Sequence, residues 1–385
     1  MRPFVRAAAT TETEPPRIAA ALRDQIGSDP AALICFFAGS SLPFPELAQH
    51  VHEAFEGART VGCTTCGELG PSSCTVGAVS ALALSPPCRA GVVLVPDLSE
   101  FRFDAGEKAL ASLARQLGTT VAAIVERARE HAFVTLTDGL SGQEEILIAA
   151  LATYAPGVPL VGGSAADDFR FVETQVAVDG KTAKSGAAIV LLAPGVPFRP
   201  FHLHHYETTA DSVVVTDAEP ERRIIHRIDG RPAIETLTRL MGIDEERLRA
   251  DPPSELRNQP TVFGIRAADD VFLRSVMDVR GDALLMGGAV EEGTVLWPMT
   301  PGNIVEVTSS GIAEAIGDLT KPAGMLLFNC GGRMWEATSA SIVEELGAAM
   351  LPVPAAGFTT YGEQYGPLQV NHTLTGIAFG EPDAD

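Results

Sequence analysis

Gly62-Cys-Thr-Thr-Cys-Gly-Glu68 recurs near the other end of the chain as Gly357-Phe-Thr-Thr-Tyr-Gly-Glu363. A looser copy, Gly162-Gly-Ser-Ala-Ala-Asp-Asp168, stands between the two. Each of these three glycine motifs follows an apolar run and an amphipathic stretch, which together predict a strand, a helix and a second strand. The recurrence indicates a chain built from related β-α-β units.

The spacing within the three units is nearly constant. The apolar run and the glycine motif lie 29, 28 and 31 residues apart, counted from Leu33 to Gly62, from Val134 to Gly162 and from Leu326 to Gly357. Unrelated turns rarely agree so closely. We therefore expect an α/β fold in which repeated β-α-β units form mixed sheets packed by helices, arranged in two related domains.

The pattern changes near Pro220, and we divide the chain there. Four segments result: an N-terminal extension (1–31), a first domain (32–222), a second domain (223–380) and a polar tail (381–385). We expect a hinge at the boundary between the two domains.

Local signals predict three further features. Ser141-Gly-Gln-Glu144 predicts a capping box at the start of a helix. Asp179-Gly180 predicts the turn of a hairpin whose return strand is 186–192. The β-branched residues in 303–308 predict a strand.

Composition excludes several classes of function. The chain has 385 residues and a net charge of −21, which argues against a nucleic-acid partner because phosphates attract clustered Lys and Arg. It lacks the apolar core of a signal peptide and any run of about 18–20 apolar residues, so we expect no membrane insertion. Six scattered cysteines indicate reduced thiols and a cytoplasmic protein.

The sequence resembles the FIST family, whose members carry an N-terminal and a C-terminal FIST domain. The resemblance runs from about Leu33 to Gly380 and rests on five segments in order: 61–65, 162–168, 228–233, 328–333 and 357–363 with 371–373. It implies a sensory module that binds small ligands in signal transduction, and some members resemble haem-containing nitric-oxide sensors. The sequence departs from the family at Cys66, where a small residue is more usual.

The resemblance and the motifs together predict a non-catalytic cytoplasmic sensor. We expect it to bind a small molecule, amino-acid-like or of another kind, between two FIST-like domains. No output domain is recognisable, so the signal would pass in trans to a histidine kinase of a two-component system or to a cyclic-dinucleotide enzyme. No P-loop, nucleophile elbow or metal-hydrolase motif indicates an enzyme. The oligomeric state stays open, with a homodimer as one alternative.

The glycine motifs are the predicted ligand site, and we expect them to converge on a common cavity. Glycines permit close backbone approach, hydroxyls offer hydrogen bonds, and a guanidinium at the end of a strand suits an anionic group. The predicted ligand-binding residues are Gly62, Thr64, Thr65, Glu68, Gly162, Ser164, Cys330, Arg333, Gly357, Thr359, Thr360, Glu363 and His372. The structural alternative is a tight turn with local threonine hydrogen bonds and a salt bridge from Arg333 to an acid such as Glu363.

A second set of residues suits haem or a metal. His202, His204 and His205 offer imidazoles, with the first two expected on one face of a strand. Cys63 and Cys66 have the spacing of half a zinc site or of a redox dithiol. The alternatives are therefore a haem-dependent nitric-oxide sensor and a thiol oxidoreductase. The cofactor stays open, with haem as a candidate.

Overall fold

The computed structural model describes residues 2–259, 261–267 and 270–382, which form two compact units. The first unit contains the chain up to Leu203, Thr308–Gln369 and the chain from Leu374 onward. The second contains His204–Val307 and Val370–Thr373. Segments of the two units alternate along the chain. The predicted domain boundary at 222/223 is instead a single division of the chain, and it stays a prediction from the sequence pattern.

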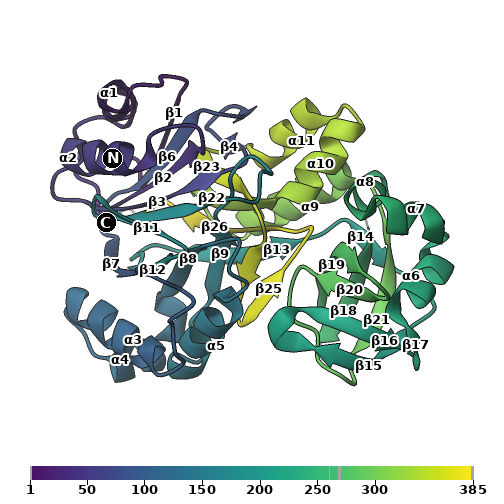
Figure 1. Ribbon diagram of the computed structural model, residues 1–385. Coiled ribbons are helices and arrows are strands. Elements are labelled where there is room, and N and C mark those ends of the chain that lie inside the picture. The colour runs from purple at the N-terminus through teal and green to yellow at the C-terminus, as the bar shows by residue number, and fades with distance from the viewer. Residues whose placement is uncertain (1, 260, 268–269, 383–385) are drawn as a thin grey trace. The chain divides into compact units, whose positions relative to one another are not determined.

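Three six-stranded sheets form the first unit (Figure 1). Their strands differ, but equivalent strands of the three repeats occupy the same positions in each sheet. The first sheet runs β1 (Val5–Thr10), β6 (Val79–Leu84), β2 (Leu33–Gly39), β3 (Arg59–Thr65), β10 (Gln175–Val178), β11 (Lys181–Lys184). The second runs β7 (Arg89–Val95), β12 (Ala187–Ala193), β8 (Ala132–Thr137), β9 (Leu160–Ser164), β24 (Glu363–Tyr365), β25 (Leu368–Val370). The third runs β13 (Phe198–Leu203), β26 (Leu374–Gly380), β22 (Pro322–Cys330), β23 (Ala355–Thr360), β4 (Glu68–Leu69), β5 (Cys74–Thr75).

Each sheet is centred on one predicted β-α-β unit. The pairs β2–β3, β8–β9 and β22–β23 are parallel, and every other pairing given for these sheets is antiparallel. The helices of the first unit are α1 (Pro15–Ile26), α2 (Phe44–Ala54), α3 (Ala105–Gln116), α4 (Val121–Glu126), α5 (Glu144–Tyr154), α9 (Ile304–Gly317, shared with the second unit), α10 (Gly331–Ser339) and α11 (Val343–Met350). The predicted fold class, α/β with mixed sheets packed by helices, is confirmed.

The hairpin after each glycine motif leaves its own unit and joins the sheet of another. Hairpin β4–β5 extends the third sheet, β10–β11 extends the first and β24–β25 extends the second. The first repeat thus gives its hairpin to the third sheet, the third repeat to the second sheet and the second repeat to the first sheet, so the exchange is cyclic. Each glycine motif is therefore the point at which the chain crosses from one sheet to the next.

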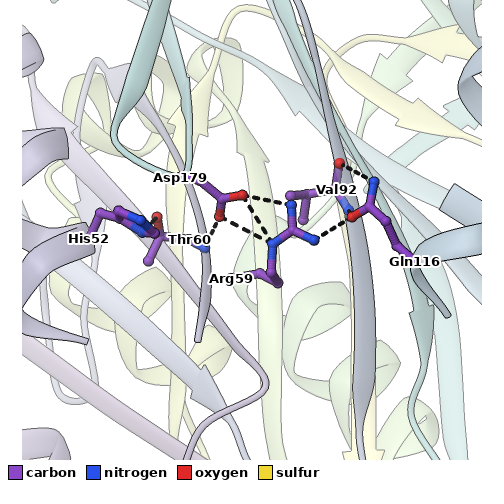
Figure 2. A network of polar contacts seen from close by, with 6 residues as sticks. All are labelled: His52, Arg59, Thr60, Val92, Gln116 and Asp179. Atoms are coloured by element: carbon purple, nitrogen blue, oxygen red, sulfur yellow. Dashed lines mark hydrogen bonds and ion pairs between the residues drawn. The ribbon is translucent and has the colours of Figure 1, made fainter. Parts of the chain in front are cut away.

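A polar network fixes one of these exchanged hairpins (Figure 2). The Arg59 Nη2 lies 2.6 Å from Asp179 Oδ2, and the Asp179 carboxylate also accepts the Thr60 amide at 3.0 Å. Asp179 and Gly180 adopt φ of 48° and 76°, so the predicted hairpin turn is confirmed. Its return strand is β11, however, and the predicted return strand at 186–192 is β12 of the second sheet.

Apolar side chains from all three sheets meet in one core. Phe37 of β2 stacks on Phe358 of β23 with ring centroids 4.9 Å apart, and Phe328 of β22 meets Phe358 edge-on at 5.7 Å. Two further clusters lie under α1 and α2 and under α3 and α5. The three sheets thus share an interior that no single repeat could form.

The second unit is a closed antiparallel barrel with helices. Its strands run β21 (Val295–Pro301), β15 (Val213–Glu219), β16 (Ile224–Ile228), β20 (Ala283–Met286), β19 (Asp270–Arg280) and β18 (Val262–Ala267), and β18 pairs back to β21. The added strands are β14 (Tyr206–Thr208) and β17 (Arg231–Pro232), and the helices are α6 (Ala233–Met241), α7 (Glu245–Ala250) and α8 (Pro252–Asn258).

Two local predictions are wrong. Helix α5 begins at Glu144, and Ser141 lies in the preceding turn, where Asp138 accepts its amide. Residues 303–308 begin α9, because Asn303 Oδ1 accepts the Val305 and Glu306 amides and caps the helix. None of the helices in the described part of the chain has the length and apolarity that spanning a membrane requires.

Candidate functional site

The three glycine motifs meet at the carboxyl ends of β3, β9 and β23, all within the first unit. Each motif is hydrogen-bonded to both of the others through the backbone. The bonds, donor first, are Ala166 N to Thr64 O (2.9 Å), Thr359 N to Gly67 O (2.7 Å), Ser164 N to Gly362 O (2.8 Å) and Tyr361 N to Ser164 O (3.1 Å). Segments about 100 and 200 residues apart in sequence therefore form one junction, which we call the motif junction.

The recurring Thr and Glu of the first and third motifs bind each other. Thr65 Oγ1 donates to Glu68 Oε1 at 2.5 Å, and the Thr360 hydroxyl donates to Glu363 in the same way. The second Glu68 oxygen accepts the Ala78 amide at 2.9 Å. Burial raises the pKa of Glu68 to about 7. These side chains hold the turns that direct hairpins β4–β5 and β24–β25 into the neighbouring sheets.

The middle positions of the motifs also have partners inside the protein. Thr64 Oγ1 accepts the Gln175 amide at 3.0 Å, where β10 joins the first sheet. Ser164 Oγ accepts from Gln364 Nε2 at 3.0 Å and lies 3.2 Å from Thr137 Oγ1. Thr359 is buried. The hydroxyls therefore contribute to a buried polar network that joins the motifs.

Sheet packing requires the first glycine of each motif. A Cβ atom at Gly357 would lie 1.9 Å from Leu327 O, one at Gly162 would lie 2.3 Å from Thr135 O, and one at Gly62 would lie 2.5 Å from Phe36 O. Each glycine faces the parallel strand that opens its own unit. The close approach of these strands accounts for this part of the motif.

Cys330 and Arg333 lie where β22 passes directly into α10. Cys330 is buried, and the Arg333 side chain is fully buried. The Arg333 Nε donates to Asn329 Oδ1 at 2.9 Å, and its Nη2 donates to Thr308 Oγ1 at 2.6 Å. The guanidinium thus ties the end of β22 to α9.

The loop 168–171, which begins at the last residue of the second motif, is held in a strained conformation. Asp168, Phe169 and Phe171 have φ of 58°, 58° and 55°, a region that residues with a side chain seldom adopt. Asp167 holds the loop by accepting amides from Phe171 and Val172 at 2.9 and 2.8 Å. Burial by itself would raise the pKa of Asp167, but the Tyr361 hydroxyl and these amides lower it below its usual value.

Exposed aromatic rings surround this loop. We call Phe169, Phe171, Trp335 and Tyr361 the aromatic cluster. Phe171 stacks on Tyr361 with centroids 4.5 Å apart, and Phe169 lies 6.1 Å from Trp335 and 6.0 Å from Tyr361. The exposed fractions are 38% for Phe169, 53% for Phe171 and 37% for Trp335. Exposed aromatic rings gathered in one place are typical of a binding surface.

Asp168 presents an unsatisfied carboxylate oxygen beside the aromatic cluster. Its Oδ2 accepts the Ser40 hydroxyl, whereas its buried Oδ1 has no hydrogen-bond partner among the residues that the structure describes. Arg170 Nη2 also donates to Ser40 Oγ, at 2.9 Å. A buried oxygen without a donor is costly, and a ligand that donates a hydrogen bond would satisfy it.

Residues 168–171 and the aromatic cluster were not predicted as site residues. The sequence does carry one signal: Phe169 and Phe171 follow the two aspartates that end the second glycine motif. Aromatic residues in a polar loop are consistent with exposure, but only the backbone conformation shows that the loop is strained.

The predicted histidines do not lie on one strand. β13 ends at Leu203, so His204 lies beyond it, and the expectation that His202 and His204 share one face of a strand is wrong. His202 stacks on Tyr365 with centroids 5.0 Å apart. His204, His205 and His372 belong to the second unit, where Tyr206 Oη lies 3.4 Å from His372 Nδ1. Within residues 2–259, 261–267 and 270–382, no three His, Cys, Asp or Glu side chains are grouped to hold a metal ion.

Cys63 and Cys66 are both buried, with different neighbours. Burial and the nearby Cys35 raise the pKa of Cys63, whereas burial and the nearby Cys330 raise the pKa of Cys66. The Cys66 thiol donates to Thr359 O at 3.2 Å. A redox dithiol needs a lowered thiol pKa, since the thiolate is the nucleophile. The thiol-oxidoreductase alternative therefore receives no support from this geometry.

Family models match most of the chain. A model described as the FIST N domain matches residues 32–231, and a model described as the FIST C domain matches residues 217–366. No curated protein matches the chain.

Proposed function

The chain belongs to the FIST family, whose domains are associated with sensing small ligands in signalling, and on this premise we propose that the motif junction of its first unit forms the sensor site. In this proposal the ligand lies against the loop 168–171 and the aromatic cluster. The first glycine motif holds the start of that loop in place, because Thr64 O accepts the Ala166 amide at 2.9 Å and Thr65 O accepts the Asp168 amide at 3.3 Å. The ligand-binding roles assigned to the motif residues themselves remain predictions.

One observation supports this site above the others: an unsatisfied buried carboxylate oxygen of Asp168 lies in a strained loop beside exposed aromatic rings. Left-handed conformations at non-glycine residues cost on the order of 1 kcal/mol each and cluster at ligand sites. A ligand with a hydrogen-bond donor, such as an ammonium or amide group, and an apolar portion fits this combination. An amino-acid-like molecule has both features.

We propose that the ligand stabilises one conformation of the loop and that a partner recognises it. The partner class would be a histidine kinase or a cyclic-dinucleotide enzyme acting in trans. A ligand shifts such an equilibrium only by its difference in affinity for the two conformations. The strained φ values of Asp168 and Phe169 indicate a loop for which a second conformation is accessible.

Native mass spectrometry of the purified full chain, followed by calorimetry with the ligand found, tests the proposal. Asp168→Asn should weaken binding about tenfold, because a charge-assisted hydrogen bond is lost, and Phe169→Ala should weaken it by a similar factor. The matched control is Phe103→Ala, an exposed phenylalanine of the first unit outside the site (43% exposed). Equal affinity in Asp168→Asn, Phe169→Ala and the wild type would show that the ligand binds elsewhere.

The same preparation decides the haem alternative. A haem-dependent nitric-oxide sensor would show a Soret band that moves on addition of nitric oxide. His202 is the candidate axial ligand in the first unit, and its imidazole stacks on Tyr365. A band that is lost in His202→Ala and kept in Asp168→Asn would replace our proposal with that alternative.

A further inference from the structure

A cavity of the first unit lies at the opposite edge of the second sheet from the motif junction. The cavity has a volume of about 930 Å³ and lies around the starts of β7 and β8, the end of β12 and the start of β13. β7 and β8 both run antiparallel to β12, so these strand ends meet at one edge. β8 has six residues, which places this edge about 20 Å from the motif junction.

The lining of this cavity reverses the charge balance of the chain. The chain has 28 basic and 49 acidic side chains, whereas the cavity is lined by four arginines and two acids. The arginines are Arg89, Arg127, Arg129 and Arg199, and the acids are Glu130 and Asp318. We call this cavity the basic pocket. On a strongly acidic protein, such a pocket is a local attraction for anions.

The four arginines make few strong hydrogen bonds or ion pairs with the described part of the protein. Arg129 has no hydrogen bond or ion pair in the described part of the chain, and Arg127 Nη1 lies 3.7 Å from Glu130 Oε2 in an exposed pair. Arg89 donates one Nη1 bond to Leu117 O at 2.8 Å. Arg199 pairs with Asp318 and Glu314. Exposed pairs contribute little to stability, so an anionic ligand can compete for these groups.

The rest of the lining makes the basic pocket suitable for a ligand with two parts. His131 is buried, and its Nδ1 lies 3.0 Å from Arg127 O, which fixes the segment that carries Arg127 and Arg129. Val196, Pro197 and Phe198 form an apolar wall. A cavity of this volume accommodates an organic ligand of ordinary size. Guanidinium groups bind phosphate through paired hydrogen bonds.

We propose that the basic pocket binds a small organic phosphate. Its phosphate oxygens lie against Arg127 and Arg129, and its apolar portion lies against the wall of Val196, Pro197 and Phe198. This site is independent of the sensor site proposed above and gives the chain a second ligand. The motif junction offers an unsatisfied carboxylate, whereas the basic pocket offers guanidinium groups, so the two sites select opposite charges.

Calorimetry of the full chain with ADP as the probe tests this proposal. ADP should bind saturably, and Arg129→Gln and Arg127→Gln should each weaken it about tenfold. Glu130→Gln should tighten ADP binding, because it removes a competing carboxylate and its repulsion. A gain in affinity cannot result from a variant that fails to fold. Arg17→Gln, an exposed arginine on α1 outside the pocket, is the matched control for net charge and should bind like the wild type.

Pyrophosphate and adenosine distinguish the two parts of the ligand. Both should bind more weakly than ADP. Pyrophosphate binding as tight as that of ADP would overturn the contact with the apolar wall, and adenosine binding as tight as that of ADP would overturn the phosphate contact. Absence of saturable ADP binding, or equal losses in Arg17→Gln and Arg129→Gln, would overturn the site itself.

Discussion

At the scale of single residues, the recurring Thr and Glu of the glycine motifs form a structural pair. Thr65 and Glu68 bind each other at the turn where the chain leaves β3, and Thr360 and Glu363 do the same after β23. A hydroxyl three residues before a carboxylate reaches it across a tight turn. The recurrence therefore maintains the hairpin crossing, and our proposal assigns ligand contact to the aromatic cluster and Asp168 instead.

Glu68→Gln should remove a pH dependence of stability. The folded pKa of Glu68 is raised to about 7 from 4.5, so the folded state binds this proton more tightly than the unfolded state. The stabilisation is present below about pH 4.5 and is lost as the pH rises through about 7, by at most about 3 kcal/mol. In urea unfolding from pH 5 to pH 8, the free energy of unfolding of the wild type should fall relative to that of Glu68→Gln.

The control for this series is Glu12→Gln, an exposed glutamate near the start of the chain. It should follow the wild type at every pH. Glutamine keeps one oxygen that can accept the Ala78 amide, and its NH2 group can donate to Thr65 Oγ1, so any cost of this rearrangement does not vary with pH. A difference between Glu68→Gln and the wild type that stays constant from pH 5 to pH 8 would contradict the raised pKa.

At the scale of elements, the exchanged hairpins depend on a few side chains at their ends. Hairpin β10–β11 reaches the first sheet through a short ladder to β3, from Val61 to Cys63. Asp179 in its turn binds Arg59 and the Thr60 amide (Figure 2). Because this ladder is short, the ion pair between Asp179 in the hairpin turn and Arg59 is important for holding the hairpin on the first sheet.

Asp179→Ala should destabilise the hairpin by about 2 kcal/mol, because it leaves a partly buried guanidinium and an amide without their acceptor. Hydrogen exchange should show faster exchange of the β10 and β11 amides, with little change in β12. The matched control is Glu173→Ala, which removes the exposed pair with Lys184 on the same hairpin. Equal exchange rates of the β10 and β11 amides in Asp179→Ala and Glu173→Ala would show that Asp179 does not hold the hairpin in place.

At the scale of the whole first unit, three exchanged hairpins and a shared core couple the repeats. Phe358 of the third repeat stacks on Phe37 of the first, and both belong to the same buried cluster. A closed ring of exchanges leaves no repeat with a complete sheet of its own. The first unit should therefore unfold as one cooperative body, although its segments lie far apart in sequence.

Phe358→Ala should lower the stability of the first unit by about 3–5 kcal/mol. Native-state hydrogen exchange should show the loss in β2, β8 and β22 alike, because all three open together. The matched control is Phe103→Ala, which removes an exposed ring from the same unit and should leave exchange unchanged. Loss of protection confined to β22 and β23 would show that the repeats unfold separately.

The sequence alone determined the repeating units. Apolar periodicity, motif spacing and the Asp179-Gly180 turn are local signals, and local backbone preferences express them directly. The helix start at Asn303 is also a local signal, because its side chain accepts the first free amides of α9, but the β-branched residues after it favour a strand, and that prediction is wrong.

Only the tertiary structure decided which strands each hairpin joins and which side chains remain exposed. A hairpin pairs equally well with any compatible sheet edge, so its own sequence does not specify a partner strand more than 100 residues away. The sequence places Asp168 at the end of a glycine motif and Phe169 directly after it, but the strained loop and the unsatisfied oxygen arise from contacts with Ser40, Asp167 and Tyr361. Long-range packing sets those contacts, because the motifs meet only when the three sheets close on one core.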